Sequence, residues 1–93
     1  MNTEKHRVII DVRSTEEFAE GHLNGALSMP HTQIDNMIES RVPDKDTPIA
    51  LYCRSGGRAG LAKTILAAKK YTTIENLGGL EKKKKKTGVE IVI

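Results

Sequence analysis

The sequence predicts an α/β domain of three layers, with a central, mainly parallel sheet of four to five strands and helices on both faces. Short apolar runs rich in β-branched residues alternate with segments whose apolar residues recur at helical spacing, which is the pattern of strands joined by crossover helices. Polar residues or glycines follow three of these runs. In parallel sheets the chemistry lies at the carboxyl ends of the strands, so a functional site is expected at that edge.

The first strand and helix are predicted near the start of the chain. Residues 7–12 form a β-branched apolar run typical of a strand that is buried on both faces. A helix is expected directly afterwards, because Ser14 and Glu17 have the spacing of a capping box. Gly21 is expected to end this helix.

The middle of the chain is expected to supply two further strands and two further helices. Residues 26–29 indicate a short strand, and residues 32–42 show the helical spacing of a segment that Pro43 ends. Residues 48–52 indicate a third strand, and residues 59–70 place their apolar side chains on one broad helical face.

The last part of the chain is expected to hold a fourth strand and a basic tail. Residues 72–77 indicate the strand, and Gly78 and Gly79 are expected to break it. Residues 80–86 are compatible with a short helix, and residues 89–93 are again apolar and β-branched.

Length and composition limit the function classes. The 93 residues are expected to form one domain, with a core over about residues 7–81 and a basic tail over residues 82–93. The single cysteine excludes an intrachain disulfide and a zinc finger. No run approaches the roughly 20 apolar residues that a membrane span needs, and residues 1–7 lack the apolar run of a signal peptide. A soluble protein without a metal is therefore expected.

The basic excess does not indicate a nucleic-acid-binding protein. The net charge of +3 depends on the five lysines of residues 82–86, without which the chain carries −2. Phe18, Tyr52 and Tyr71 are too few for base stacking along a basic face. We interpret the lysine run as a solvated helix end, the alternative being that it raises the positive potential near an anion site.

The loop between the third strand and the following helix carries the residues with the clearest chemistry. It consists of Cys53, Arg54, Ser55, Gly56, Gly57 and Arg58. Two adjacent glycines allow a tight curl in which successive N–H groups converge at the positive end of a helix, and this makes a nest for an anion. Such a nest favours a thiolate, and the two arginines add positive charge that suits an oxyanion.

Two simpler interpretations of this loop stay open. Cys53 would be a small buried hydrophobic residue at the end of a strand, a common place for cysteine. Arg54 would point into solvent. The first interpretation leaves the two glycines and two arginines around the cysteine without an explanation.

Taken together, these residues resemble a single-domain rhodanese, a thiosulfate sulfurtransferase, of the small phage-shock type. The resemblance covers residues 8–80 and rests on the order and spacing of several short segments. These are residues 10–13, Glu17-Phe18, Gly21-His22, Gly25-Ala26, Pro30, residues 52–58 and residues 76–80.

The resemblance implies a role for each matching residue. Cys53 matches the nucleophile that takes the outer sulfur of thiosulfate and holds it as a persulfide, and the amides of residues 54–58 match the cradle for that sulfur. Asp11 and Arg13 match a motif that supports the site, which we interpret as charge pairing that orients the loop arginines; alternatively Asp11 only caps its turn. His22 matches a structural position. No cofactor is implied.

The resemblance also implies the partners and the competing functions. The acceptor of the sulfur would be cyanide, a small thiol or a thioredoxin-like protein, and a monomer is expected. Six residues from Cys53 to Arg58 favour sulfur chemistry, because the related phosphatases and arsenate reductases have seven. A non-catalytic sulfur carrier or regulatory module is the other alternative, and modules of that kind typically lack the cysteine.

The chain departs from the family pattern at both ends. The family usually has an extra strand and helix before Val8, so one sheet edge is expected to be open, and we expect residues 89–93 to pair beside residues 73–77 and cover it. The lysine run stands where the family often has an aromatic helix. The phage-shock type is commonly exported, so a removed signal peptide would imply the periplasm, and otherwise the cytoplasm is expected.

Overall fold

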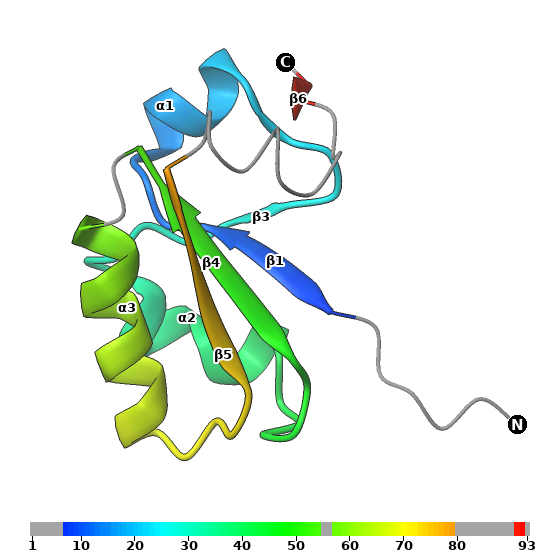
Figure 1. Cartoon of the computed structure of the whole chain (residues 1–93), viewed down its shortest axis with the longest axis vertical. Helices are drawn as coiled ribbons and strands as arrows, with labels where there is room; N and C mark the ends of the chain where they lie inside the picture. The colour runs from blue at the N-terminus through cyan, green and yellow to red at the C-terminus, as the bar shows by residue number, and fades with distance from the viewer. Residues whose placement is uncertain (1–6, 55–56, 80–90, 93) are drawn as a thin grey trace, which may run out of the picture.

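A four-stranded parallel sheet forms the centre of the protein. The computed structural model describes residues 7–54, 57–79 and 91–92. The strands of the sheet, in the order β3-β1-β4-β5, are β1 (Val8–Asp11), β3 (Leu27–Ser28), β4 (Ile49–Cys53) and β5 (Ile74–Gly79) (Figure 1). Every neighbouring pair is parallel, so Cys53 lies at the same edge as the ends of the other three strands. The predicted α/β class is confirmed.

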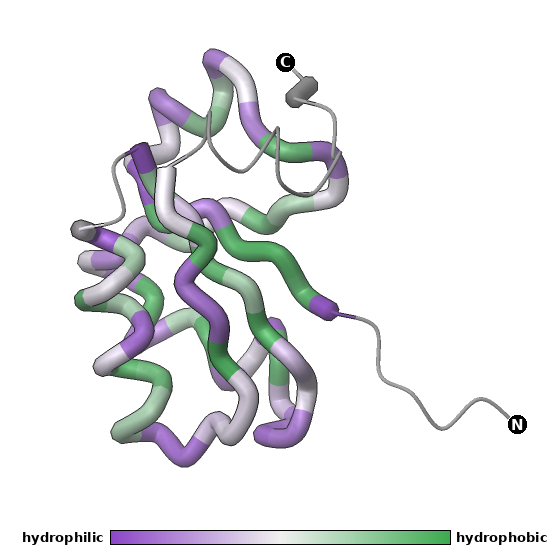
Figure 2. The backbone as a smooth tube through the Cα atoms, viewed as in Figure 1, coloured by the Kyte–Doolittle hydropathy of each residue, from purple (hydrophilic) through white to green (hydrophobic). Residues whose placement is uncertain are grey.

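Helices cover both faces of this sheet. One face packs against α2 (Ile34–Arg41) and α3 (Gly57–Ala68), and the other packs against Phe18 of α1 (Thr15–Glu20). Leu51 and Cys53 of β4 belong to the first cluster, whereas the alternating residues Ala50 and Tyr52 belong to the second. Figure 2 shows hydrophobic residues along β1 and β4 between these layers. Because successive side chains of a strand point to opposite faces, β4 is buried throughout.

The capping box that the sequence predicts for α1 is present. The Ser14 hydroxyl accepts a hydrogen bond from the backbone N–H of Glu17 (3.2 Å), and the Glu17 carboxylate accepts one from the backbone N–H of Ser14 (3.1 Å). These two bonds satisfy donors that the first turn of a helix otherwise leaves without partners. The helix ends at Gly21, as predicted, and the Gly21 N–H donates to the Phe18 carbonyl.

The prediction that Gly78 and Gly79 break the fourth strand is wrong. Strand β5 continues to Gly79, which lies opposite Cys53 of β4. The register shifts by one residue between Asn76 and Gly78, and Gly78 has a φ of 88°. Glycine adopts this left-handed backbone without steric strain, so the strand absorbs one extra residue as a bulge and keeps pairing.

The prediction that residues 89–93 pair beside β5 is also wrong. The structure places Ile91–Val92 as β6, which pairs antiparallel with a strand absent from the prediction, β2 (His22–Leu23). The reason is geometric. β5 ends at the carboxyl edge of the sheet, and β2 lies at the same edge, where the Leu23 N–H donates to the Tyr52 hydroxyl.

Two further expectations concern other parts of the chain. The predicted helix over residues 80–86 and the lysine run 82–86 lie outside the described residues. Among the residues that the structure does describe, no helix has the length and apolar character needed to cross a membrane.

Candidate active site

Cys53 is the last residue of the central strand β4. Its side chain is fully buried and packs in the hydrophobic cluster beneath α2 and α3. The next helix, α3, begins only four residues later at Gly57. Ser55 and Gly56, which the sequence assigns to the sulfur cradle, lie outside the described residues. Burial alone would also fit a structural cysteine, so the charged residues beside it decide the interpretation.

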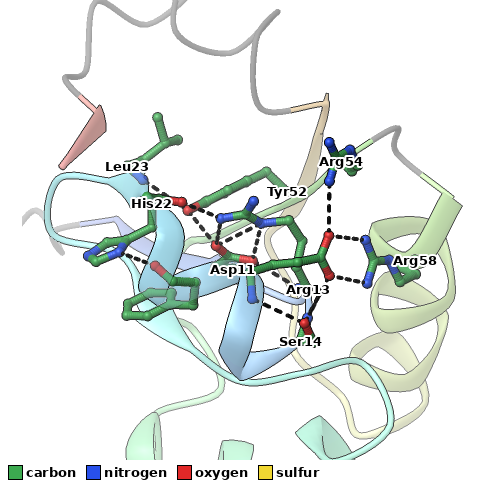
Figure 3. A network of polar contacts seen from close by, with 11 residues as sticks. Asp11, Arg13, Ser14, His22, Leu23, Tyr52, Arg54 and Arg58 are labelled. Atoms are coloured by element: carbon green, nitrogen blue, oxygen red, sulfur yellow. Dashed lines mark hydrogen bonds and ion pairs between the residues drawn. The ribbon is translucent and has the colours of Figure 1, made fainter. Parts of the chain in front are cut away.

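Arg58 is held at the site by Glu17 of α1. Its Nη1 lies 2.8 Å from Oε1 of Glu17 and its Nη2 lies 3.1 Å from Oε2, which makes a two-point ion pair (Figure 3). The Glu17 side chain is 21% exposed and that of Arg58 is 31% exposed. Paired N–H donors that match both carboxylate oxygens fix the orientation of a guanidinium. Arg58 therefore has one defined position.

Arg54 approaches the same carboxylate more loosely. Its Nη1 lies 3.6 Å from Oε2 of Glu17, and its side chain is 76% exposed. Figure 3 shows Arg54 at the end of β4 and Arg58 on α3. One carboxylate on α1 thus joins the two arginines of the loop.

The charges of this cluster support one another. The pKa of Glu17 is lowered from 4.5 to about 2, mainly by the hydrogen bond from Arg58 and also by the bonds from Ser14, against the opposing effect of burial. In return, Glu17 raises the pKa of Arg58, to which the charge of Cys53 makes a smaller contribution in the same direction. Cys53 is therefore within electrostatic reach of Arg58.

A second polar network is buried directly beneath the site. Arg13 donates to both carboxylate oxygens of Asp11, from Nε at 3.0 Å to each and from Nη2 at 2.7 Å to Oδ2. The Arg13 backbone N–H also donates to Oδ1, and Nη2 donates to the Gly21 carbonyl at 2.6 Å. The bonds to Asp11 raise the pKa of Arg13 against the effect of burial.

Tyr52 completes this buried network. Its hydroxyl donates to Oδ2 of Asp11 (2.9 Å) and accepts from the Leu23 N–H (3.0 Å). Burial is the main cause that raises the pKa of Tyr52 well above its ordinary 10.0, so the hydroxyl keeps its proton and remains a donor. The network ties β1, β2 and β4 together at the edge of the sheet that holds Cys53.

The structure changes the roles expected for several site residues. Asp11 and Arg13 pair with each other, and Glu17 is the residue that contacts Arg54 and Arg58. The expected pairing of Asp11 with the loop arginines is therefore not present, and Glu17 takes that place. The reason is that the Asp11 carboxylate already accepts hydrogen bonds from Arg13 and Tyr52. Asp11 also accepts from the backbone two residues on, as the turn-capping alternative requires.

Gly57 and His22 have simpler roles. Gly57 is the first residue of α3 and does not have a left-handed backbone, so the curl does not need a glycine there. His22 stacks on the Phe18 ring, with centroids 3.6 Å apart, and its Nδ1 lies 2.8 Å from the Phe18 carbonyl. This agrees with the structural role that the sequence predicts for His22.

Sequence reasoning missed Glu17 and Tyr52 as members of these networks. Glu17 is recognisable from sequence only as part of a capping box, and its reach to α3 depends on how the helices pack. The role of Tyr52 could have been predicted from the sequence, because the hydroxyl of a tyrosine in a fully buried strand needs a polar partner. That partner, Asp11, lies opposite it in the register between β1 and β4.

This fold and this loop define the class of the protein. A family model of the rhodanese-like domain matches residues 1–86. The chain therefore belongs to the rhodanese-like domain family, and the resemblance predicted from the sequence is confirmed.

Individual relatives agree with this assignment. Thiosulfate sulfurtransferase PspE of Escherichia coli K12 is 40% identical over 77% of this chain and 69% of its own length. A sulfurtransferase of Allochromatium vinosum is 35% identical over 77% of this chain and 65% of its own length. The chain thus spans about two thirds of the length of these relatives. The solved structure of a rhodanese with anions from E. coli is 34% identical, with a TM-score of 0.85 over 94% of this chain and 98% of that one.

Proposed function

We propose that this chain is a thiosulfate sulfurtransferase that carries the transferred sulfur as a persulfide on Cys53. The observation that carries the proposal is the place of Cys53, at the end of β4, before α3 and within electrostatic reach of Arg58. Family membership and relatives named as sulfurtransferases support rhodanese-type sulfur transfer. Thiosulfate as donor and cyanide or a small thiol as acceptor are the specific parts of the proposal.

The first half-reaction forms the persulfide. The Cys53 thiolate attacks the outer sulfur of thiosulfate, the bond between the two sulfur atoms of thiosulfate breaks, and its electron pair leaves with sulfite. Positive charge near the leaving group stabilises the negative charge that gathers on sulfite, and Arg54 and Arg58 supply it. The burial of Cys53 shields the resulting persulfide from bulk water.

The second half-reaction returns the enzyme to its starting state. Cyanide or a thiol attacks the outer sulfur of the persulfide, and the electron pair of the broken bond returns to Cys53 as a thiolate. Two steps that share one covalent enzyme form give ping-pong kinetics. We assign Asp11 and Arg13 a supporting role, because their buried pairing fixes the end of β1 beside the end of β4.

Intact mass measurement tests this proposal. After incubation with thiosulfate and removal of small molecules, we expect the wild-type protein to gain the mass of one sulfur atom and to lose it again on addition of cyanide. The Cys53→Ser variant is expected to gain nothing. A wild type that stays unmodified, or a serine variant that takes up sulfur, would contradict the mechanism.

A further inference from the structure

The two loop arginines stand in unequal positions relative to Glu17. Arg58 uses both terminal nitrogens in a two-point ion pair at 2.8 and 3.1 Å. Arg54 makes one contact at 3.6 Å and is 76% exposed. The guanidinium of Arg58 is therefore already bound on one side, whereas that of Arg54 is accessible to an incoming anion.

The carboxylate that produces this inequality is itself firmly held. Oε1 of Glu17 accepts from the backbone N–H and from the hydroxyl of Ser14, both at 3.1 Å, in addition to Arg58. Because the pKa of Glu17 is lowered to about 2, the carboxylate stays ionised at neutral pH. Its negative charge offsets one of the two positive charges that the loop presents.

We propose that Glu17 is a positioning residue that keeps Arg58 in an ion pair with α1 and leaves Arg54 as the arginine that binds a doubly charged donor. This inference rests on the proposed function for the identity of the donor. Glu17 would thus help to set the affinity for the donor. Its negative charge offsets that of one loop arginine, so that thiosulfate binds at a site with one net positive charge rather than two.

The substitution that isolates this effect is Glu17→Gln. Glutamine serves as well as glutamate at this position of a capping box, so the cap of α1 is retained while the negative charge is removed. Arg58 then loses its charged partner and becomes able to bind the donor beside Arg54. Glu17→Gln is therefore expected to tighten the binding of thiosulfate, about two- to fivefold for a partly exposed charge.

A double-mutant cycle gives the decisive measurement. All proteins carry Cys53→Ser, so that thiosulfate binds without reacting, and its dissociation constant is measured by NMR titration of the backbone amides. We expect Arg54→Ala to weaken binding about tenfold when Glu17 is present, and only about two- to threefold when Glu17→Gln has freed Arg58. The two substitutions would thus be coupled.

Two control variants separate this role from simpler ones. Glu16→Gln removes the same charge from the same turn of α1 at an exposed residue whose only side-chain bond in the described structure is to Thr15. Ser14→Ala weakens the cap of α1 and leaves the charge of Glu17 in place. Neither variant is expected to change the tenfold effect of Arg54→Ala.

The outcome that overturns the inference is independent of turnover. If Arg54→Ala weakens thiosulfate binding by the same factor with and without Glu17→Gln, or if Glu17→Gln weakens binding, Glu17 does not divide the roles of the two arginines. Failure of the sulfurtransferase proposal would appear separately, as a wild-type protein that gains no sulfur in the mass measurement.

Discussion

Tyr52 shows how much one side chain can hold together at this site. Its aromatic ring packs in the cluster on the α1 face of the sheet, and its hydroxyl lies between the Leu23 N–H and the Asp11 carboxylate. Both partners are buried and have no access to water. The Tyr52 side chain therefore connects β1, β2 and β4 next to Cys53, although it points to the opposite face of the sheet from the cysteine.

Tyr52→Phe should lower the free energy of unfolding by about 1–3 kcal/mol, because it removes a donor from a buried carboxylate and an acceptor from a buried N–H. Urea denaturation measures the change. Tyr71→Phe is the matched comparison, since that hydroxyl makes one hydrogen bond within the described residues, to the Val42 carbonyl, and we expect it to have the smaller effect. Equal losses in the two variants would contradict this account of Tyr52.

The residues that carry the proposed chemistry could be predicted from sequence, whereas their partners could not. Cys53, Arg54 and Arg58 fall within six consecutive positions, so a local motif reveals them. Glu17 lies 41 positions from Arg58, and their contact depends on the angle at which α1 approaches α3. A capping box satisfies Glu17 locally, and nothing in the sequence indicates that the same carboxylate has a second partner.

Strand β5 contains a glycine with a left-handed backbone. Gly78 has a φ of 88° at the point where the register with β4 shifts, and a Cβ there would meet no atom within 4 Å. Any penalty for a side chain at Gly78 therefore comes from the backbone conformation alone. Gly60 in α3 offers the opposite case, because its backbone is helical and its Cβ would lie 3.7 Å from Asn76.

Gly78→Ala should lower the free energy of unfolding by about 1–2 kcal/mol, the price of a left-handed backbone for a residue with a Cβ. Gly60→Ala should raise it by about 0.5–1 kcal/mol, because alanine loses less conformational freedom in a helix. Thermal and urea denaturation of the two variants would show the opposite signs. A Gly78→Ala protein as stable as the wild type would refute the assignment of the bulge.

Strand β2 is the element that the sequence did not predict. It has two residues, too few for an apolar pattern to repeat. A strand over residues 89–93 was expected, but its partner was wrong, because the pairing of β6 with β2 joins positions about seventy residues apart. The longer strands and α3 were predictable, because their apolar residues repeat often enough to indicate a period.

For the whole molecule, the ion pairs at Glu17 make stability depend on pH. The folded-state pKa of Glu17 is about 2, below its ordinary value of 4.5. A lowered folded pKa contributes stability above the unfolded pKa, and this contribution is lost as the pH falls toward the folded pKa. The window for Glu17 therefore extends from about pH 4.5 down to about pH 2.

Glu17→Gln should accordingly be less stable than the wild type at neutral pH, with a difference in unfolding free energy that shrinks across this window. Urea denaturation at a series of pH values, with Glu16→Gln as the control for removal of a carboxylate outside the cluster, measures it. A difference that stays constant from pH 6 to pH 2 would show that the ion pair with Arg58 contributes no acid-sensitive stability.

The order of the strands was beyond the reach of the sequence, although the fold class was not. Alternating strands and helices predict a parallel sheet, and Cys53 was correctly expected at its carboxyl edge. The sequence predicts that the first strand is buried on both faces, but it does not show which other strand shares the centre of the sheet, and the structure places β4 there.

The pairing of β6 with β2 affects the choice of terminus for a fusion tag or a surface linkage. Arg7 precedes the start of β1, whose first residue lies opposite Ile49, at the other end of β4 from Cys53. Ile91–Val92 instead lie against β2, close to the helix that carries Glu17 (Figure 1). A purification tag, reporter or surface linkage should therefore be fused before Arg7, because one fused after Val92 would pull on the strand pair beside the active edge.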